Sequence, residues 1–160
     1  MKKLSLILFL LLYVSCYSQE IAKPKNIAYL DLGIIFTGSS SYAFGVGLNY
    51  ERMLNDNLSI RAGMNIAFYN THIIGDEVSG TSIGFPITLN YMTNSKNKFE
   101  VGLGGGPRIS LTDENSNIFF PAARIGYRYQ PDETGMIYRL GIEVPSNVYI
   151  SLGGVGYQFK

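Results

Sequence analysis

The sequence contains a single cysteine and a single histidine among its 160 residues. Cys16 lies in the apolar segment that opens the chain, so the remainder has no thiol, no disulfide and no cysteine ligand for a metal. His72 is the only imidazole, and one histidine without cysteine does not make a zinc site of the usual kind. We therefore expect neither a metal nor a cofactor.

Charged residues are also scarce. They make up 16% of the chain, against about 25% in typical soluble domains. The 13 basic and 12 acidic residues nearly cancel, which gives a net charge of +1, and no basic stretch follows the first few residues. A nucleic-acid partner requires a strong positive field, so we expect no such partner.

The chain opens with the three-part pattern of a secretory signal. Two lysines precede an unbroken apolar run, residues 6–14, and small residues follow it, as such signals require. We predict that residues 1–18 are a signal peptide that is cleaved, and that residues 19–160 form one domain. A second interpretation stays open, because the residues before Cys16 loosely resemble a lipoprotein signal, in which that cysteine becomes the lipidated first residue.

No segment has the period of a helix, and the pattern that is present repeats every second residue. In residues 41–54, large side chains such as Phe44 and Leu48 alternate with small or polar ones such as Gly47 and Asn49. This period is typical of a β-strand with two unlike faces. Eight segments show it: residues 26–36, 41–54, 57–69, 81–92, 98–111, 118–130, 136–144 and 148–160.

Turn-like stretches rich in Asn, Asp, Gly and Ser separate these segments, which is the composition of turns. The longest, residues 70–80, is the only one long enough to make a binding surface. Within the last segment the alternation changes phase, which predicts a β-bulge near Gly153 and Gly154. The pattern predicts an all-β fold, an antiparallel up-and-down barrel of eight strands.

Eight alternating strands fit two kinds of barrel, which differ in the face turned inward. A soluble ligand-binding barrel encloses its apolar face, whereas an outer-membrane barrel turns that face to lipid. An eight-stranded barrel is too narrow to enclose the many Phe, Tyr, Leu and Ile side chains of the large face. The small face fits inside, and its acidic and basic residues nearly balance, as buried charges must. These residues are Asp31, Glu51, Arg61, Glu100, Arg108, Arg124, Arg128, Arg139 and Glu143.

Strand pairing brings some of these inward charges close together, because residues opposite each other on neighbouring strands are in reach of one another. We expect three such contacts: Glu51 with Arg61, Arg124 with Glu143, and Glu100 with Arg128. The interior of the predicted transmembrane barrel is therefore polar and filled by a charge network.

The large face has the features of a lipid-facing surface. Strands of about 9 to 11 residues at a steep tilt cross a bilayer, and closure leaves no backbone edge unpaired in hydrocarbon. Aromatic residues gather near both ends of the strands, as in the girdles of membrane barrels. One group is Tyr50, Tyr91, Phe99, Tyr127, Tyr129, Tyr138, Tyr157 and Phe159, and the other is Phe36, Tyr42, Phe44, Phe68 and Phe119.

With its opening signal, eight amphipathic strands and the ending VGYQFK, the chain resembles the small outer-membrane β-barrel proteins of Gram-negative bacteria, the OmpA and OmpX type. The resemblance covers the whole mature chain and implies that both chain ends lie in the periplasm. It also implies contact with outer-membrane lipid, lipopolysaccharide and the assembly machinery. In that family the terminal strand is the assembly signal, here Val155, Tyr157 and Phe159, although Lys160 follows the last aromatic residue.

We expect a monomeric barrel in the cell outer membrane with a structural or surface-interaction role and no enzymatic activity. His72, Asp76 and Glu77, in the longest outer loop, are candidate contact residues. Three alternatives stay open: a narrow passive, porin-like pore, a soluble periplasmic ligand-binding barrel, and a lipid A modifying enzyme. The enzyme has the least support, because His72 has no nucleophile at a recognisable spacing.

Overall fold

The structure is a computed structural model that describes residues 25–36, 42–73, 76–112, 118–144 and 148–159. The predicted signal peptide, residues 1–18, lies outside the described residues. The described elements are β1 (Asn26–Phe36), β2 (Tyr42–Met53), β3 (Leu58–Ile73), β4 (Asp76–Gly84), β5 (Ile87–Met92), β6 (Asn97–Ser110), β7 (Ile118–Tyr129), β8 (Gly135–Val144) and β9 (Val148–Phe159). In this part of the chain, no helix has the length and apolar character to cross a membrane.

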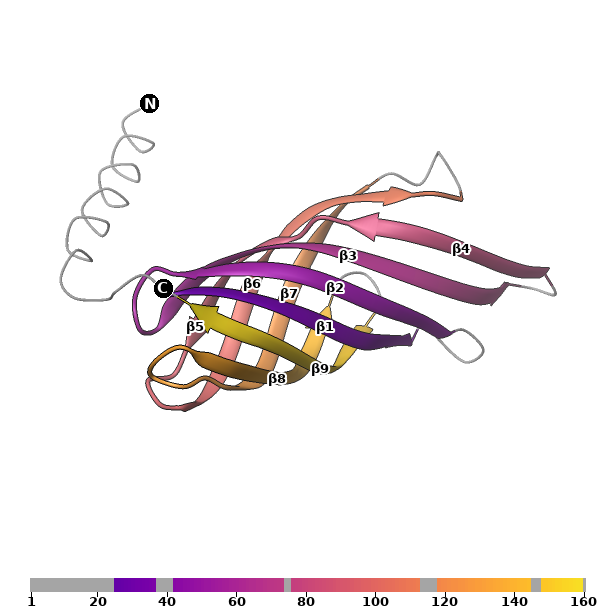
Figure 1. The fold of residues 1–160 in the computed structure, drawn as a ribbon. Coiled ribbons are helices and arrows are strands. Elements are labelled where there is room, and N and C mark those ends of the chain that lie inside the picture. The colour runs from indigo at the N-terminus through magenta and orange to yellow at the C-terminus, as the bar shows by residue number, and fades with distance from the viewer. Residues whose placement is uncertain (1–24, 37–41, 74–75, 113–117, 145–147, 160) are drawn as a thin grey trace, which may run out of the picture.

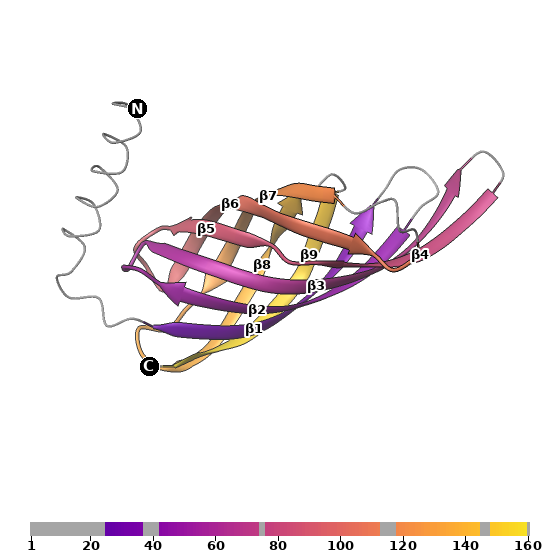
Figure 2. The ribbon, with the colours of Figure 1, turned by 90° about the horizontal axis from the view of Figure 1, so that it is seen from above.

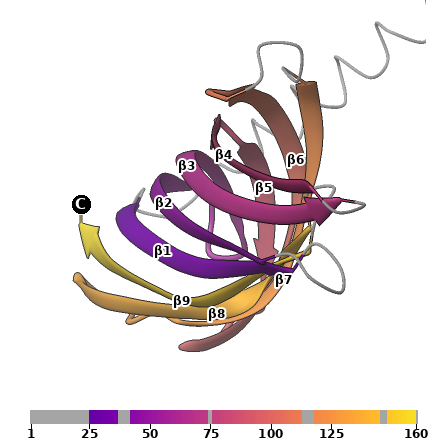
Figure 3. The ribbon, with the colours of Figure 1, turned by 90° about the vertical axis from the view of Figure 1, so that its right-hand side faces the viewer.

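The strands form one antiparallel sheet that closes on itself. Consecutive barrel strands pair with each other, and β1 pairs with β2 on one side and with β9 on the other. Along this closing seam Asn26 lies opposite Phe159, so the two ends of the described chain meet at the same end of the barrel (Figure 1). Figures 2 and 3 show the sheet curved around an interior. The predicted all-β antiparallel barrel is confirmed.

β4 and β5 are two parts of one barrel strand, which makes the barrel eight-stranded. Both pair with β3 and with β6, and the register is the same on either side of the break. The interruption falls at Phe85 and Pro86, because Pro86 has no N–H to donate to the ladder. The backbone N–H of Phe85 still donates to the carbonyl oxygen of Pro107 at 2.9 Å. The predicted strand of residues 81–92 is present, with a proline break within it.

The prediction that residues 70–80 form a long loop is wrong. Residues 70–80 belong to a β-hairpin in which β3 and β4 continue to pair, with His72 opposite Glu77, and only residues 74 and 75 separate the two strands. The hairpin projects beyond the other strands, at the end of the barrel opposite the chain ends (Figures 1 and 2). A strand that continues past the apolar belt no longer needs large apolar side chains on one face. Its polar sequence therefore resembles a loop.

β9 contains the predicted bulge. Leu32 of β1 lies opposite Gly153, but the next residue, Gly33, lies opposite Ser151, so β9 has one residue more than β1 at this place. The register between β9 and β8 shifts at the same level. A bulge of one residue reverses the side-chain phase of the strand that follows. This reversal places Val155 and every second residue after it on the outer face.

The alternation sorts the side chains as predicted. Along β5, Ile87, Leu89 and Tyr91 are exposed, whereas the residues between them are buried. The same alternation puts Glu100 of β6 inside and Leu103 outside. The large apolar face is therefore the outer one, which contradicts a barrel that encloses its apolar face around a ligand.

Glycines allow β6 to approach the neighbouring strand closely. A Cβ added at Gly104 would lie 2.0 Å from the carbonyl oxygen of Ile87, and one at Gly106 would lie 1.9 Å from that of Phe85. These distances are far inside van der Waals contact, so any larger residue forces the strands apart. The glycine run of β6 thus allows the close approach of neighbouring backbone that a narrow barrel requires.

Candidate functional site

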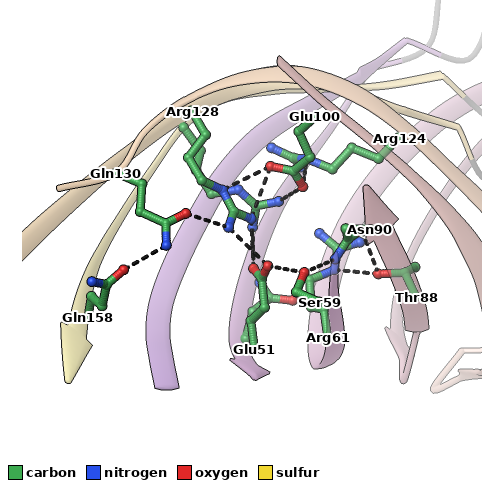
Figure 4. Close-up of polar contacts among 12 residues, drawn as sticks. Glu51, Ser59, Arg61, Thr88, Asn90, Glu100, Arg124, Arg128, Gln130 and Gln158 are labelled. Atoms are coloured by element: carbon green, nitrogen blue, oxygen red, sulfur yellow. Dashed lines mark hydrogen bonds and ion pairs between the residues drawn. The ribbon is translucent and has the colours of Figure 1, made fainter. Parts of the chain in front are cut away.

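The buried charges form a network that crosses the interior (Figure 4). Arg128 of β7 donates from Nη1 and Nη2 to Oε1 and Oε2 of Glu51, at 2.9 and 2.7 Å, and from Nε to Oε2 of Glu100, at 3.0 Å. All three side chains are fully buried. Glu51 is on β2, which is separated from β7 by three strands along the closing side of the sheet, so the contact spans the lumen. Bidentate pairs of this kind are the strongest charge-assisted hydrogen bonds.

Three further arginines continue the network. Arg124 lies between two carboxylates, with Nε 3.4 Å from Oε1 of Glu100 and Nη1 3.3 Å from Oε2 of Glu143. Arg61 donates from Nη2 to the same oxygen of Glu143, at 3.0 Å, and Arg139 pairs with Glu100. Glu100 therefore contacts three arginines, whereas Glu143 contacts two.

Neutral polar side chains extend the network. Arg61 donates from Nε to Oγ1 of Thr88 at 2.9 Å. The hydroxyl of Ser59 donates to Glu51, and Nδ2 of Asn90 donates to Oγ of Ser59 at 3.4 Å. Such bonds satisfy donors and lone pairs that the ion pairs leave over. Sequence reasoning missed these residues as network members, and their signal in the sequence is only that they share the inward phase.

Two of the three predicted contacts are present: Arg124 with Glu143, and Glu100 with Arg128. The third is wrong in part. Glu51 and Arg61 are register partners on β2 and β3, as expected, but no ion pair joins them. Arg61 pairs with Glu143 and Glu51 with Arg128 instead. The lumen is narrow enough for a long arginine side chain to reach the opposite wall, where a carboxylate can meet it end to end.

Two predicted members lie apart from these contacts. Asp31 is 4% exposed, and its Oδ2 accepts a hydrogen bond from Nδ2 of Asn49 at 3.1 Å. Its other oxygen has no hydrogen-bond partner among the described residues. Arg108, toward the far end of β6, is half-buried and makes no ion pair with a described carboxylate. The remaining seven predicted residues are joined by ion pairs.

A cluster of apolar side chains lies inside the barrel, at the end where the chain termini meet. Its members are Ile27, Tyr29, Met53, Met92 and Ile137. The guanidinium of Arg139 lies over the ring of Tyr29, 4.2 Å from its centre, so the cluster adjoins the charge network. Tyr29 shares the phase of Asp31, which the sequence predicts to face inward, and sequence reasoning missed the other members. Counting in steps of two would have found Ile27 from Tyr29, and Ile137 from Arg139.

The outer face is apolar on every barrel strand. Large hydrophobic side chains with exposed fractions of 37% to 75% occur from β1 to β9. Soluble monomers rarely expose a contiguous apolar patch larger than a few hundred Å². A belt around the whole barrel therefore requires apolar surroundings.

Exposed tyrosines ring this belt near the end where the chain termini meet. Tyr50 donates from its hydroxyl to Oδ1 of Asn26, and Tyr127 does so to Oδ1 of Asn97, both at 2.7 Å. Asn26 and Asn97 are the first residues of β1 and β6. The rings thus have an apolar body along the belt and a polar tip at its edge, the position that tyrosine prefers at a membrane interface. At the other end Phe44, Phe68 and Phe119 are exposed, and the side chains of Phe36 and Tyr42 lie outside the described set.

Two further groups of predicted residues keep their roles as predictions. The expected assembly signal is on the outer face of β9, beside β1 across the closing seam: Val155, Tyr157 and Phe159. The expected outer contacts are in the β3–β4 hairpin, where only their backbone is described: His72, Asp76 and Glu77. Within the described ranges, no group of three or more His, Cys, Asp or Glu residues is placed to hold a metal ion.

Comparisons with known proteins bear on the fold. No protein-family model matches the sequence, and a comparison with curated proteins finds no match. Among solved structures, the N-terminal β-barrel domain of Pseudomonas aeruginosa OprF is similar with a TM-score of 0.54 at 14% identity, over 84% of this chain and 97% of that one. The outer membrane protein OprG from Pseudomonas aeruginosa is similar with a TM-score of 0.56 at 13% identity, over 89% and 98%. Ail, the attachment invasion locus protein of Yersinia pestis, solved with the heparin analogue sucrose octasulfate, is similar with a TM-score of 0.50 at 16% identity, over 85% and 97%. The fold is that of small outer-membrane barrels.

Proposed function

We propose that this chain is an integral outer-membrane β-barrel protein with a structural or surface-interaction role and a closed interior. The observation that carries the proposal is the arrangement of the two faces. Glu100 and Arg128 are fully buried, whereas Leu103 is 65% exposed. Each exposed apolar side chain of the belt gains free energy when lipid replaces water around it. A bilayer is the solvent that suits this surface.

The contents of the lumen support a closed interior. The network formed by Glu51, Glu100, Glu143 and their arginines crosses the barrel from wall to wall. The apolar cluster around Ile27 lies beside the network, toward the end of the barrel where the chain termini meet. An ion that passes through would have to separate bidentate pairs and then cross an apolar layer, and both steps cost free energy.

The β3–β4 hairpin supports the surface-interaction part of the proposal. It projects at the end opposite the chain termini (Figure 1), and its paired backbone gives it a defined shape. With the termini in the periplasm, the hairpin stands on the outer side of the membrane. We propose that the hairpin contacts lipopolysaccharide and that the belt contacts outer-membrane lipid. We further propose that the assembly machinery is a partner in folding, and that the barrel is a monomer without catalytic activity.

The first experiment is electrophoresis of membrane-extracted protein in SDS, with and without boiling. We expect faster migration of the unboiled sample, because a closed barrel resists SDS until it is heated, and no difference after prior unfolding. Cell fractionation accompanies it, with recovery expected in the outer-membrane fraction. Recovery in the soluble periplasmic fraction with no heat shift would contradict the proposal.

A narrow passive pore is the second candidate, and glycines in the inward phase of the strands favour it. Gly104 is exposed, and Gly63 and Gly141 are half-buried. These positions have no side chain to fill the interior. Planar-bilayer recordings separate the candidates: discrete conductance steps from folded protein, absent from a boiled sample, would establish the pore and overturn the closed interior.

A further inference from the structure

A hollow of about 440 Å³ lies at the end of the barrel where the chain termini meet. Three turns surround it, those between β2 and β3, between β5 and β6, and between β7 and β8. The hollow collects lysines from separate segments: Lys25 precedes β1, Lys96 is in a turn, and Lys98 is on the inner face of β6. We call it the turn-end hollow.

Lys98 is buried without a counter-ion. It is 8% exposed, and its Nζ donates to the backbone carbonyl oxygens of Asp56 and Thr93, each at 3.5 Å. No carboxylate of the described chain lies within ion-pair distance of it. An ammonium group has three donors, and two long bonds to neutral oxygens leave it under-compensated. A buried charge in this state is stabilised by any anion that reaches it.

The other charges at the hollow do not place a carboxylate in contact with Lys98. Nζ of Lys96 pairs with Oδ2 of Asp132 at 3.2 Å, and Lys25 donates to the backbone oxygen of Asp132. Arg128, deeper in the lumen, already holds Glu51 and Glu100. Lys25 is only half-buried. Lys98 is therefore the buried ammonium at the hollow that has no described carboxylate in contact, and Asp56 and Asp132 act on it only at longer range.

Neutral donors complete the lining. The amides of Asn55 and Asn94 border the hollow together with the lysines. Ammonium and amide groups around one space are donors that a phosphate group accepts from, and lysine binds phosphate as a point charge. Two aspartates, Asp56 and Asp132, also line the hollow, which disfavours a large polyanion.

We propose that the turn-end hollow binds the phosphate group of a small soluble solute, with Lys98 as its buried contact. The solute enters from the side of the membrane on which the chain termini lie. A lipid headgroup is the less suitable source of the phosphate, because the hollow opens between turns at the barrel mouth, whereas lipid contacts outward-facing side chains such as Tyr50 and Tyr127.

The test is a titration of the folded protein, in a neutral detergent free of phosphate, with inorganic phosphate, followed by backbone amide chemical shifts. We expect saturable shifts confined to the three turns, absent when sodium chloride of the same ionic strength is added. Lys98→Met should weaken binding by about tenfold to a hundredfold, the usual range for losing a hydrogen bond to a charged group. Lys98→Arg, which keeps the charge, should retain binding.

Arg52→Gln is the matched control. Arg52 lies near the end of β2, at the same end of the barrel as the hollow. It is exposed and does not line the hollow, so the variant removes one positive charge without touching the proposed site. Equal weakening by Lys98→Met and Arg52→Gln would show long-range attraction only and would overturn the proposal, as would the absence of saturable shifts. Binding of short-chain phosphatidic acid without binding of inorganic phosphate would assign the site to a lipid and overturn the soluble ligand. Heat-shifted migration in SDS verifies that each variant is folded.

Discussion

Replacing Arg128 with leucine should be the most damaging single change among the charged residues of the lumen. Arg128 makes both short ion-pair contacts of Glu51, at 2.9 and 2.7 Å. Without it, Glu51 retains the hydroxyl of Ser59 and a contact to Arg139 at 4.0 Å. Breaking a buried ion pair by removing one partner costs about 3–5 kcal/mol. The folding equilibrium should therefore fall by about a hundredfold to a few thousandfold.

Urea titration of protein folded into phospholipid vesicles measures this loss, with the folded fraction read from the band that migrates faster without boiling. Arg52→Gln is the control, because this exposed residue on the same strand as Glu51 should change stability by no more than about 0.5 kcal/mol. The double variant Glu51→Leu with Arg128→Leu should lose less than the sum of the two single changes, because it leaves no carboxylate stranded. If Arg128→Leu and Arg52→Gln unfold at the same urea concentration, the assigned role of the network in stability is refuted.

Three other changes test separate parts of the structure in the same unfolding assay. Arg124→Leu should cost less than Arg128→Leu, because Glu143 keeps Arg61 at 3.0 Å and Glu100 keeps two other arginines; an equal or greater loss would contradict the observed pairing. Gly104→Leu should prevent the heat-shifted form altogether, because its Cβ would lie 2.0 Å from a backbone oxygen of β5; normal folding would show that β6 does not approach so closely. Leu103→Lys, in the middle of the outer face of β6, should cost about 2–4 kcal/mol, and Leu111→Lys, beyond the end of that strand, about 0–1 kcal/mol, as the depth dependence of lysine in a bilayer requires; equal costs would count against a lipid-facing belt.

Strand number and the assignment of faces could be predicted from the sequence because a single rule governs both. Side chains two apart share a face, so one buried charge such as Glu100 fixes the direction of Gly102, and one exposed residue such as Leu103 fixes that of Val101. The same rule located the bulge, because the alternation in the sequence changes phase between residues 150 and 155, and the register with β1 shifts by one residue there. The period and phase of the alternation are local properties of each strand, so they can be determined from the sequence without knowledge of the tertiary structure.

The pairing of charges across the lumen could not be predicted in this way. Glu51 and Arg61 are adjacent across a hairpin, which is the only proximity that sequence order reveals. Their actual partners, Arg128 and Glu143, are brought near by closure of the barrel and by the tilt of its strands. Those are properties of the whole sheet, and no single hairpin encodes them.

The end of the apolar belt also limits what the sequence reveals. Within the belt, one face of each strand must be apolar, and the alternation is clear. In residues 70–80 the strands have left the belt, so backbone pairing continues without an apolar face to mark it. A polar stretch between two amphipathic strands is therefore ambiguous, since a loop and a hairpin that projects into water share the same composition.

Asp31 belongs to the network for an electrostatic reason, although it makes no ion pair at contact distance with a described residue. The network contains four arginines and three glutamates, so the buried contacts alone leave one positive charge in excess. Asp31 supplies the fourth negative charge. It lies on β1 opposite Gly154 of β9, which in turn lies opposite Arg139 of β8, so the two charges face the lumen on either side of a glycine. Charges in a poorly solvated interior interact over several ångströms, and the charge balance of the network is therefore set by which residues share the inward face as well as by which of them touch.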